Sequence, residues 1–224
     1  MLGNIGKDSK YLNRIKDATA HIADHPRHHG IKMQAHHLIS ADGVHESRLG
    51  KKLAEFGYDI NLLPNLVFIP SSLQGACHLS VQPHRGNHTA PIASELDDDL
   101  DHPDTYHTMV SKRIREMADL LSQNCPGDDA QHRAKVTKEM NKISNKILNM
   151  IQKAPALAPL TYIASSFSMG ANGCKGVDQV PTHRRVNTPC PVDRNHEDKQ
   201  GKNQNKENIK YKHISVAYQL KAGS

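Results

Sequence analysis

Apolar residues recur along the chain at two different spacings, one typical of helices and one typical of strands. Four stretches carry apolar residues three or four positions apart, so each predicts an amphipathic helix. These stretches are residues 7–20, 46–56, 108–121 and 130–153. Residues 31–40 alternate loosely and residues 65–70 form a short apolar run ended by proline, so both predict strands. The last two helices together predict a helical hairpin.

The pattern weakens towards the C-terminal end of the sequence. From residue 154 onward the chain has the composition of loops, and residues 198–207 are polar enough to predict disorder. A last alternating run at residues 209–220 could add one or two strands, as a C-terminal hairpin. We therefore expect an α+β protein in three parts. They are a core over residues 1–107, a helical hairpin over 108–153 that braces it, and a loop-rich tail over 154–224.

Composition narrows the class of protein. The chain has 224 residues, of which 37% are hydrophobic and 23% charged, which is enough to bury one good core. No run approaches the roughly 20 apolar residues of a membrane span, and no secretory signal is visible at the N-terminus. The net charge of +6 is compatible with a polyanionic partner such as nucleic acid. The 16 histidines are the more telling feature, because histidine is a common ligand of metal ions.

Two pairs of histidines have spacings that suit a metal site. His36 and His37 are adjacent near the end of the first predicted strand. His84 and His88 are four residues apart, which on a helix would place both rings on one side. One metal ion could then take two ligands from the helix and a third from the strand, with positions left for water and a phosphate. The remaining histidine could act as a general base. Taken singly, each pair could equally be ordinary polar surface.

Other histidines and cysteines carry weaker signals. His28 and His29 are also adjacent, but they lie in a loop and are expected to be solvated surface. A structural zinc site or a disulfide in the C-terminal region stays open, although the spacing fits no common zinc finger. Its candidate residues are Cys174, His183, Cys190 and His196. The chain has no Cys-x-x-Cys pair, which argues against a zinc-dependent deaminase.

Four short segments, in this order and spacing, resemble one nuclease family. They are residues 34–40 (QAHHLIS), 56–61 (FGYDIN), 65–70 (NLVFIP) and 84–88 (HRGNH). Together they make residues 31–110 similar to the AHH family, a branch of the HNH/endonuclease VII nucleases. The resemblance implies a ββα-metal fold around one divalent cation (Mg, Mn, Zn or Ni) and hydrolysis of nucleic acid, with DNA favoured over RNA. An acidic stretch precedes Tyr106 and His107, where the family pattern would continue sooner into a helix with a tyrosine.

The resemblance also implies a role for each matching residue. The metal ligands would be His36, His84 and His88, and His37 would be the general base. Asn65 would hydrogen-bond across the hairpin loop to orient the base. Arg85 would contact the phosphate in the transition state, and Lys51 and Lys52 would touch the nucleic-acid backbone elsewhere.

Relatives of this type often serve as toxin domains. We therefore expect an antibacterial effector domain, delivered by type VI secretion into the cytoplasm of a target cell as part of a larger polypeptide and matched by a cognate immunity protein. Two alternatives stay open on the residues alone. A non-catalytic nucleic-acid-binding module would use the basic surface, and a zinc-stabilised interaction protein would use the histidines structurally.

Overall fold

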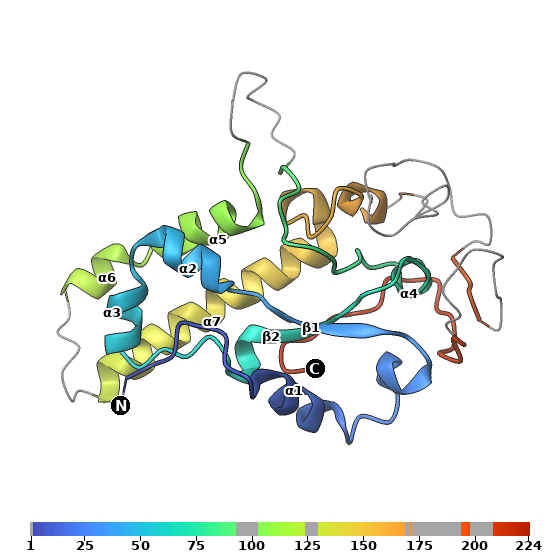
Figure 1. Cartoon of the computed structure of the whole chain (residues 1–224), viewed down its shortest axis with the longest axis horizontal. Coiled ribbons are helices and arrows are strands. Elements are labelled where there is room, and N and C mark those ends of the chain that lie inside the picture. Colours follow the sequence, from blue (N-terminus) through green and yellow to red (C-terminus); the bar gives the residue numbers. More distant parts are fainter. Residues whose placement is uncertain (1, 93–102, 124–129, 169–170, 172–193, 198–207) are drawn as a thin grey trace.

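The computed structural model describes residues 2–92, 103–123, 130–168, 171, 194–197 and 208–224, and shows helices around a small two-stranded sheet (Figure 1). The possible zinc ligands Cys174, His183 and Cys190 and the predicted disorder at 198–207 lie outside the described residues. So does most of the acidic stretch before Tyr106. The expected mixture of helix and strand is confirmed.

Both predicted strands are present and pair with each other. Strand β1 (Met33–His37) is antiparallel to β2 (Leu66–Pro70), with His36 opposite Val67. Every residue of β2 is buried, which agrees with its continuous apolar sequence. On its other side, β2 exchanges backbone hydrogen bonds with Gly223 and Ser224, so that edge of the sheet is covered.

Seven α-helices surround the sheet within the described part of the chain. They are α1 (Tyr11–Thr19), α2 (Ala41–Ser47), α3 (Gly50–Glu55), α4 (Leu73–Leu79), α5 (Tyr106–Arg115), α6 (Ala118–Gln123) and α7 (Ala130–Lys153). Short 3₁₀ turns lie at Pro26–His29, Leu63–Asn65, Pro155–Leu157 and Ala164–Phe167.

Three of the predicted elements need correction. The helix expected over residues 46–56 is two helices, because Arg48 adopts a left-handed conformation (φ 62°) that ends α2. The helix expected over 108–121 is likewise divided, into α5 and α6. Residues 209–220 form no strand, since their backbone groups bond to other segments, such as Tyr218 N–H to the carbonyl of Leu79. Helix α4 was missed, although Ser72 caps its first turn.

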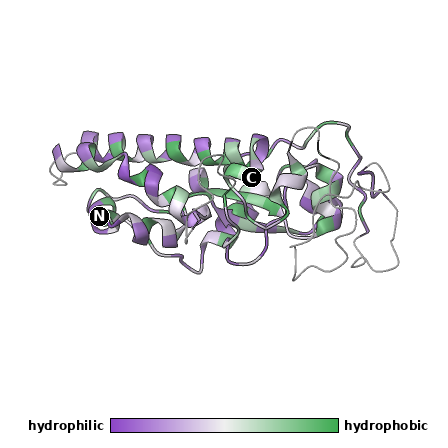
Figure 2. Ribbon diagram, turned by 90° about the horizontal axis from the view of Figure 1, so that it is seen from above, coloured by the Kyte–Doolittle hydropathy of each residue, from purple (hydrophilic) through white to green (hydrophobic). Residues whose placement is uncertain are grey.

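The long helix α7 supplies one wall of the core, as its periodicity predicts. Its buried positions recur every three or four residues from Val136 to Ile151, and hydrophobic and hydrophilic positions alternate along it in Figure 2. The main buried cluster joins Leu38 beside the sheet, Ile147 of α7 and Leu220 of the tail. All three predicted parts of the chain therefore contribute to one core, and their division into domains stays a prediction.

Close packing between α2 and α5 sets one side of the candidate site. A side chain added at Gly43 would lie 2.5 Å from Val110, so only glycine lets the two helices approach this closely. The contact brings Ser40, which caps α2, to His107 of α5, with 2.8 Å between Oγ and Nδ1. No helix in the described part of the chain is both long enough and apolar enough to span a membrane.

Candidate metal centre and active site

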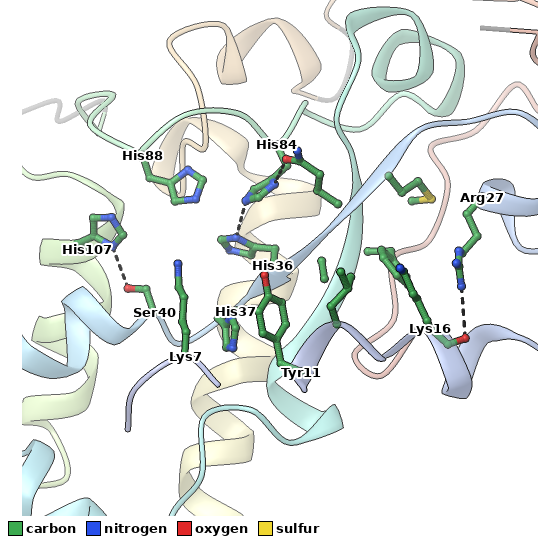
Figure 3. Close-up of a pocket in the computed structure, with 15 residues that line it drawn as sticks. Lys7, Tyr11, Lys16, Arg27, His36, His37, Ser40, His84, His88 and His107 are labelled. Carbon is green, nitrogen blue, oxygen red and sulfur yellow. Dashed lines mark hydrogen bonds between the residues drawn. The ribbon is translucent and has the colours of Figure 1, made fainter. Parts of the chain in front are cut away.

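Three histidine side chains converge at the end of β1. Their nearest ring nitrogens lie within 4.8 Å of one another, and Figure 3 shows the rings facing a common space. His36 comes from β1, whereas His84 and His88 come from the segment that follows α4. They are the three residues that the sequence predicts as metal ligands.

The helix expected at His84 and His88 is wrong, because this segment is a loop. Gly86 has a φ of +76° and His88 a φ of +57°, and these left-handed conformations are incompatible with a continuous helix. The loop is anchored where His84 N–H donates to the carbonyl of Pro70, 2.7 Å away at the end of β2. The turn at Gly86 therefore brings the two rings together, with their centroids 5.0 Å apart.

Hydrogen bonds fix which nitrogen of His36 carries a proton. Tyr106 Oη donates its single proton to the carbonyl of Leu38 at 2.7 Å. The same oxygen lies 2.8 Å from His36 Nε2 and has no second proton to donate. It must therefore accept this hydrogen bond, so Nε2 carries the ring proton. The other nitrogen, Nδ1, keeps a lone pair that points towards His84.

The other two histidines are fixed in the same way. His84 Nδ1 lies 3.1 Å from Gln34 Oε1, and His88 Nδ1 lies 3.2 Å from the carbonyl of Leu160, so both nitrogens donate. Each ring then presents an unprotonated Nε2. Outer hydrogen bonds of this kind hold metal-binding histidines in one tautomer.

The inner nitrogens suit one shared cation. His36 Nδ1 and His84 Nε2 are 3.0 Å apart, and the outer hydrogen bonds leave a lone pair on each. Two nitrogens that each lie about 2.0–2.1 Å from one metal ion are roughly 2.8–3.0 Å apart in octahedral geometry and roughly 3.3–3.4 Å apart in tetrahedral geometry. Facing lone pairs repel without a cation between them. The spacing of this pair and the chemistry of all three donors therefore fit a divalent ion that accepts imidazole ligands.

Burial keeps these rings neutral and ready to bind metal. Removal from water lowers the pKa of His36 well below its usual value, and the neighbouring His84 and His88 lower it further. Burial, followed by the neighbouring His88, lowers the pKa of His84 to about 3. Burial also lowers the pKa of His88 to about 4, partly offset by its hydrogen bond to the carbonyl of Leu160. All three ligands are therefore deprotonated at neutral pH, as metal coordination requires.

His37 lies beside this triad and is held by an asparagine. Its Nε2 is 3.1 Å from Asn61 Oδ1. The amide orientation is fixed, because Asn61 Nδ2 donates to the carbonyl of Gly6 and to Asp59 Oδ1, both at 2.8 Å. Nε2 of His37 therefore carries the proton, and Nδ1 keeps the lone pair that a general base needs. Burial is the main cause that lowers the pKa of His37, partly offset by the Asn61 bond.

A comparison with protein-family models decides the family. Residues 16–152, well over half of the chain, match the AHH model, described as a nuclease family of the HNH/ENDO VII superfamily with conserved AHH. The chain belongs to the AHH nuclease family. No curated protein and no solved structure gave a significant match.

For this AHH nuclease, the orienting role expected of Asn65 falls to Asn61. The Asn65 side chain does bond across the hairpin loop, but to the backbone of Ile39 on both its N–H (2.7 Å) and its carbonyl (3.0 Å). Ser144 of α7 donates to the same asparagine at 2.9 Å. Asn65 thus fixes the loop that follows His37, rather than the ring itself. The sequence signal for Asn61 is its place at the end of the FGYDIN segment, and the structure buries its side chain fully.

The cations predicted to contact substrate lie elsewhere. Arg85 is not among the residues that line the cavity at the triad, and its Nη1 is buried with no hydrogen-bond partner among the described residues. Lys51 and Lys52 are exposed on α3, and Lys51 lines a different depression beside Arg115. Their predicted roles are therefore not supported by their positions.

A cavity of about 550 Å³ opens over the triad and His37. Its wall also carries Tyr11, whose ring centroid is 4.6 Å from that of His37, and three cationic residues from the N-terminal part of the chain. These are Lys7, Lys16 and Arg27. Sequence reasoning missed them, because no short motif marks a residue that reaches the site only through the tertiary fold.

Proposed function

We propose that this AHH nuclease is a metal-dependent phosphodiesterase whose centre is a ββα-metal core. Strands β1 and β2 would be the hairpin of that core, and α5 would be its helix, since α5 supplies Tyr106 to His36. The observation that carries the proposal is the convergence of three unprotonated ring nitrogens beside a fourth histidine of fixed tautomer.

Each residue has a defined part in hydrolysis. His36, His84 and His88 would hold one divalent ion, which when bound neutralises negative charge on the phosphate and on the leaving oxygen. His37 Nδ1 takes a proton from water while the water oxygen forms a bond to phosphorus. The bond from phosphorus to the 3′ oxygen breaks, and that oxygen takes a proton from solvent. The products are a 5′-phosphate and a 3′-hydroxyl, and His37 then returns its proton to solvent.

The charge of the cavity supports a nucleic-acid substrate. Lys16 is exposed on α1, and the guanidinium of Arg27 lies 4.9 Å from the ring of Phe68 along the same wall (Figure 3). Cations in a row attract a phosphate backbone, and the half-buried ring of Tyr11, which lines the cavity, offers a surface on which a base can stack. DNA is favoured over RNA as substrate.

The biological role proposed for the chain follows from its family. It would act as a toxin domain that degrades nucleic acid in the cytoplasm of a target bacterium, delivered as part of a larger type VI secretion effector. The producing cell would need a cognate immunity protein that blocks the cavity.

The first test is cleavage of plasmid DNA and of a structured RNA by the purified chain. The wild type should degrade DNA with Mg, Mn, Zn or Ni present and should stop when a chelator is added. His37→Ala should cleave at least about 10²-fold more slowly, because a positioned general base contributes that much. Its metal affinity, measured by calorimetry, should be unchanged.

The matched control is His45→Ala, since His45 is exposed on α2 and outside the cavity. Intact DNA and RNA with all four metals would reject the nuclease proposal in favour of a binding module. Loss of metal binding in His37→Ala would overturn the division of roles between His36 and His37.

A further inference from the structure

One cation of the cavity lies much closer to the chemistry than the others. Lys7 is exposed, and its side chain in Figure 3 rises into the space flanked by His36, His88 and Ser40. Lys7 lines the same cavity as all four histidines, His36, His37, His84 and His88. Its ammonium group therefore lies beside the proposed reacting centre.

The backbone around Lys7 is held by the residue that orients the base. Asn61 Nδ2 donates to the carbonyl of Gly6, and Asn61 Oδ1 accepts from the N–H of Asp8 at 3.1 Å. The same Oδ1 accepts from His37. One buried amide therefore fixes the position of the base and of both neighbours of Lys7 at once, which is the arrangement expected of two groups that act on one substrate atom.

Lys7 has no counter-ion among the described residues. The adjacent carboxylate of Asp8 is already engaged, because it accepts from Tyr11 N–H at 2.7 Å and pairs with Arg14 at 2.8 Å. The first of these bonds satisfies an N–H in the first turn of α1, and the second neutralises the carboxylate. The ammonium group of Lys7 is thus available to an anion that enters.

A lysine in this place cannot serve metal binding, because its positive charge repels a divalent cation. It is favourable only if the site also takes an anion. We propose that Lys7 is a catalytic residue that contacts the scissile phosphate and stabilises the extra negative charge of its transition state. This inference rests on the proposed phosphodiesterase function. It assigns to Lys7, which precedes the family-matched residues 16–152, the role expected of Arg85.

The test compares Lys7→Met with Lys10→Met, which makes the same change at an exposed residue three positions away and outside the cavity. At saturating metal, Lys7→Met should cleave about 10²-fold more slowly, the loss typical of one donor to an oxyanion. Lys10→Met should stay within about twofold of wild type, since a surface charge away from the cavity changes little. Lys7→Arg should recover at least about tenfold of the loss, because it restores the charge.

Two further readouts separate this role from a structural one. Metal affinity of Lys7→Met should be equal to or tighter than that of wild type, whereas a loosened site would bind metal more weakly. The slope of log K against log salt for a labelled oligonucleotide should fall by about 0.7–0.9, as for one lost phosphate contact. Equal cleavage by Lys7→Met and Lys10→Met, or a parallel loss of metal affinity and rate, would overturn the proposal for Lys7 alone. No cleavage by wild type would overturn the proposed function as well.

Discussion

The chain contains two pairs of adjacent histidines, and only one pair lies at the candidate metal site. His28 and His29 each use Nε2 to bond a nearby backbone carbonyl, that of Thr19 at 3.0 Å and that of Ala23 at 2.8 Å. They lie in a 3₁₀ turn at the surface, away from the cavity. His36, by contrast, is buried and faces two further histidines from a distant loop.

The difference between the pairs is not in the residue type but in where the lone pairs point. At His36 the outer nitrogen is held by Tyr106 and the inner nitrogen faces His84. Burial removes the water that would otherwise satisfy that inner nitrogen. A buried lone pair that receives no hydrogen bond favours a bound cation. The rings of His28 and His29, by contrast, already have hydrogen-bond partners in the backbone.

The largest expected effect breaks this comparison at a ligand. His84→Ala removes one of three inner nitrogens, so metal affinity measured by calorimetry should fall at least about 10²-fold and cleavage at limiting metal at least as far. His28→Ala, its matched control, should leave both values within about twofold of wild type, as for other surface substitutions. Equal effects from the two variants would mean that the triad is not the metal site.

A smaller effect is expected at the asparagine that joins the base to the N-terminal segment. Asn61→Ala frees Nε2 of His37 and loosens the backbone beside Lys7, so cleavage should fall about 10–100-fold. Because Asn61 contacts none of the three ligands in the described structure, metal affinity should stay within about threefold of wild type.

Asn13→Ala, on the exposed face of α1, is the control for this change. Wild-type cleavage by Asn61→Ala would show that the fixed tautomer of His37 is not needed. A fall in metal affinity as large as the fall in rate would show instead that Asn61 supports the whole site.

The smallest effect concerns a buried histidine that lies outside the triad and its cavity. His78 donates from Nε2 to the carbonyl of Tyr211 at 2.8 Å and accepts at Nδ1 from the N–H of His196 at 3.1 Å. Burial lowers its pKa to about 4, below the value near 6.5 of the unfolded chain. The unfolded chain therefore takes up the proton first, and stability is lost as the pH falls from about 6.5 to about 4.

Thermal unfolding across this pH range, in the presence of chelator, measures the effect. For a chain of this size, each kcal/mol lost lowers Tm by roughly 2–4 °C. His78→Gln removes one titrating group, so its Tm should depend less on pH between 6.5 and 4 than that of wild type. Parallel curves for the two proteins would contradict the assignment of a neutral, buried His78.

The sequence predicted the parts of the site that short segments carry. Both strands and α7 could be predicted from apolar spacing, and the three converging histidines from the order of four motifs, because these signals are local. The spacing of four residues between His84 and His88 predicts a helix, but the structure has a loop there. This spacing fits a helix and a turn at Gly86 equally well. Spacing alone cannot distinguish them.

The residues that complete the site could not be read in this way. Lys7, Asn61 and Tyr106 reach the histidines from three separate parts of the chain, through hydrogen bonds that only the folded chain forms. Arg85 was assigned by its place next to a ligand, but neighbours in a loop can point in opposite directions. Short motifs therefore identified the converging histidines better than they identified the other residues that line the cavity.

The most direct test of the account is anomalous X-ray diffraction from crystals of the chain grown with Zn or Mn. The account predicts one strong peak within coordination distance of His36 Nδ1, His84 Nε2 and His88 Nε2, with the outer nitrogens still bonded to Tyr106, Gln34 and the carbonyl of Leu160. A peak at other residues, coordination through the outer nitrogens, or a triad without metal at saturating concentration would contradict it.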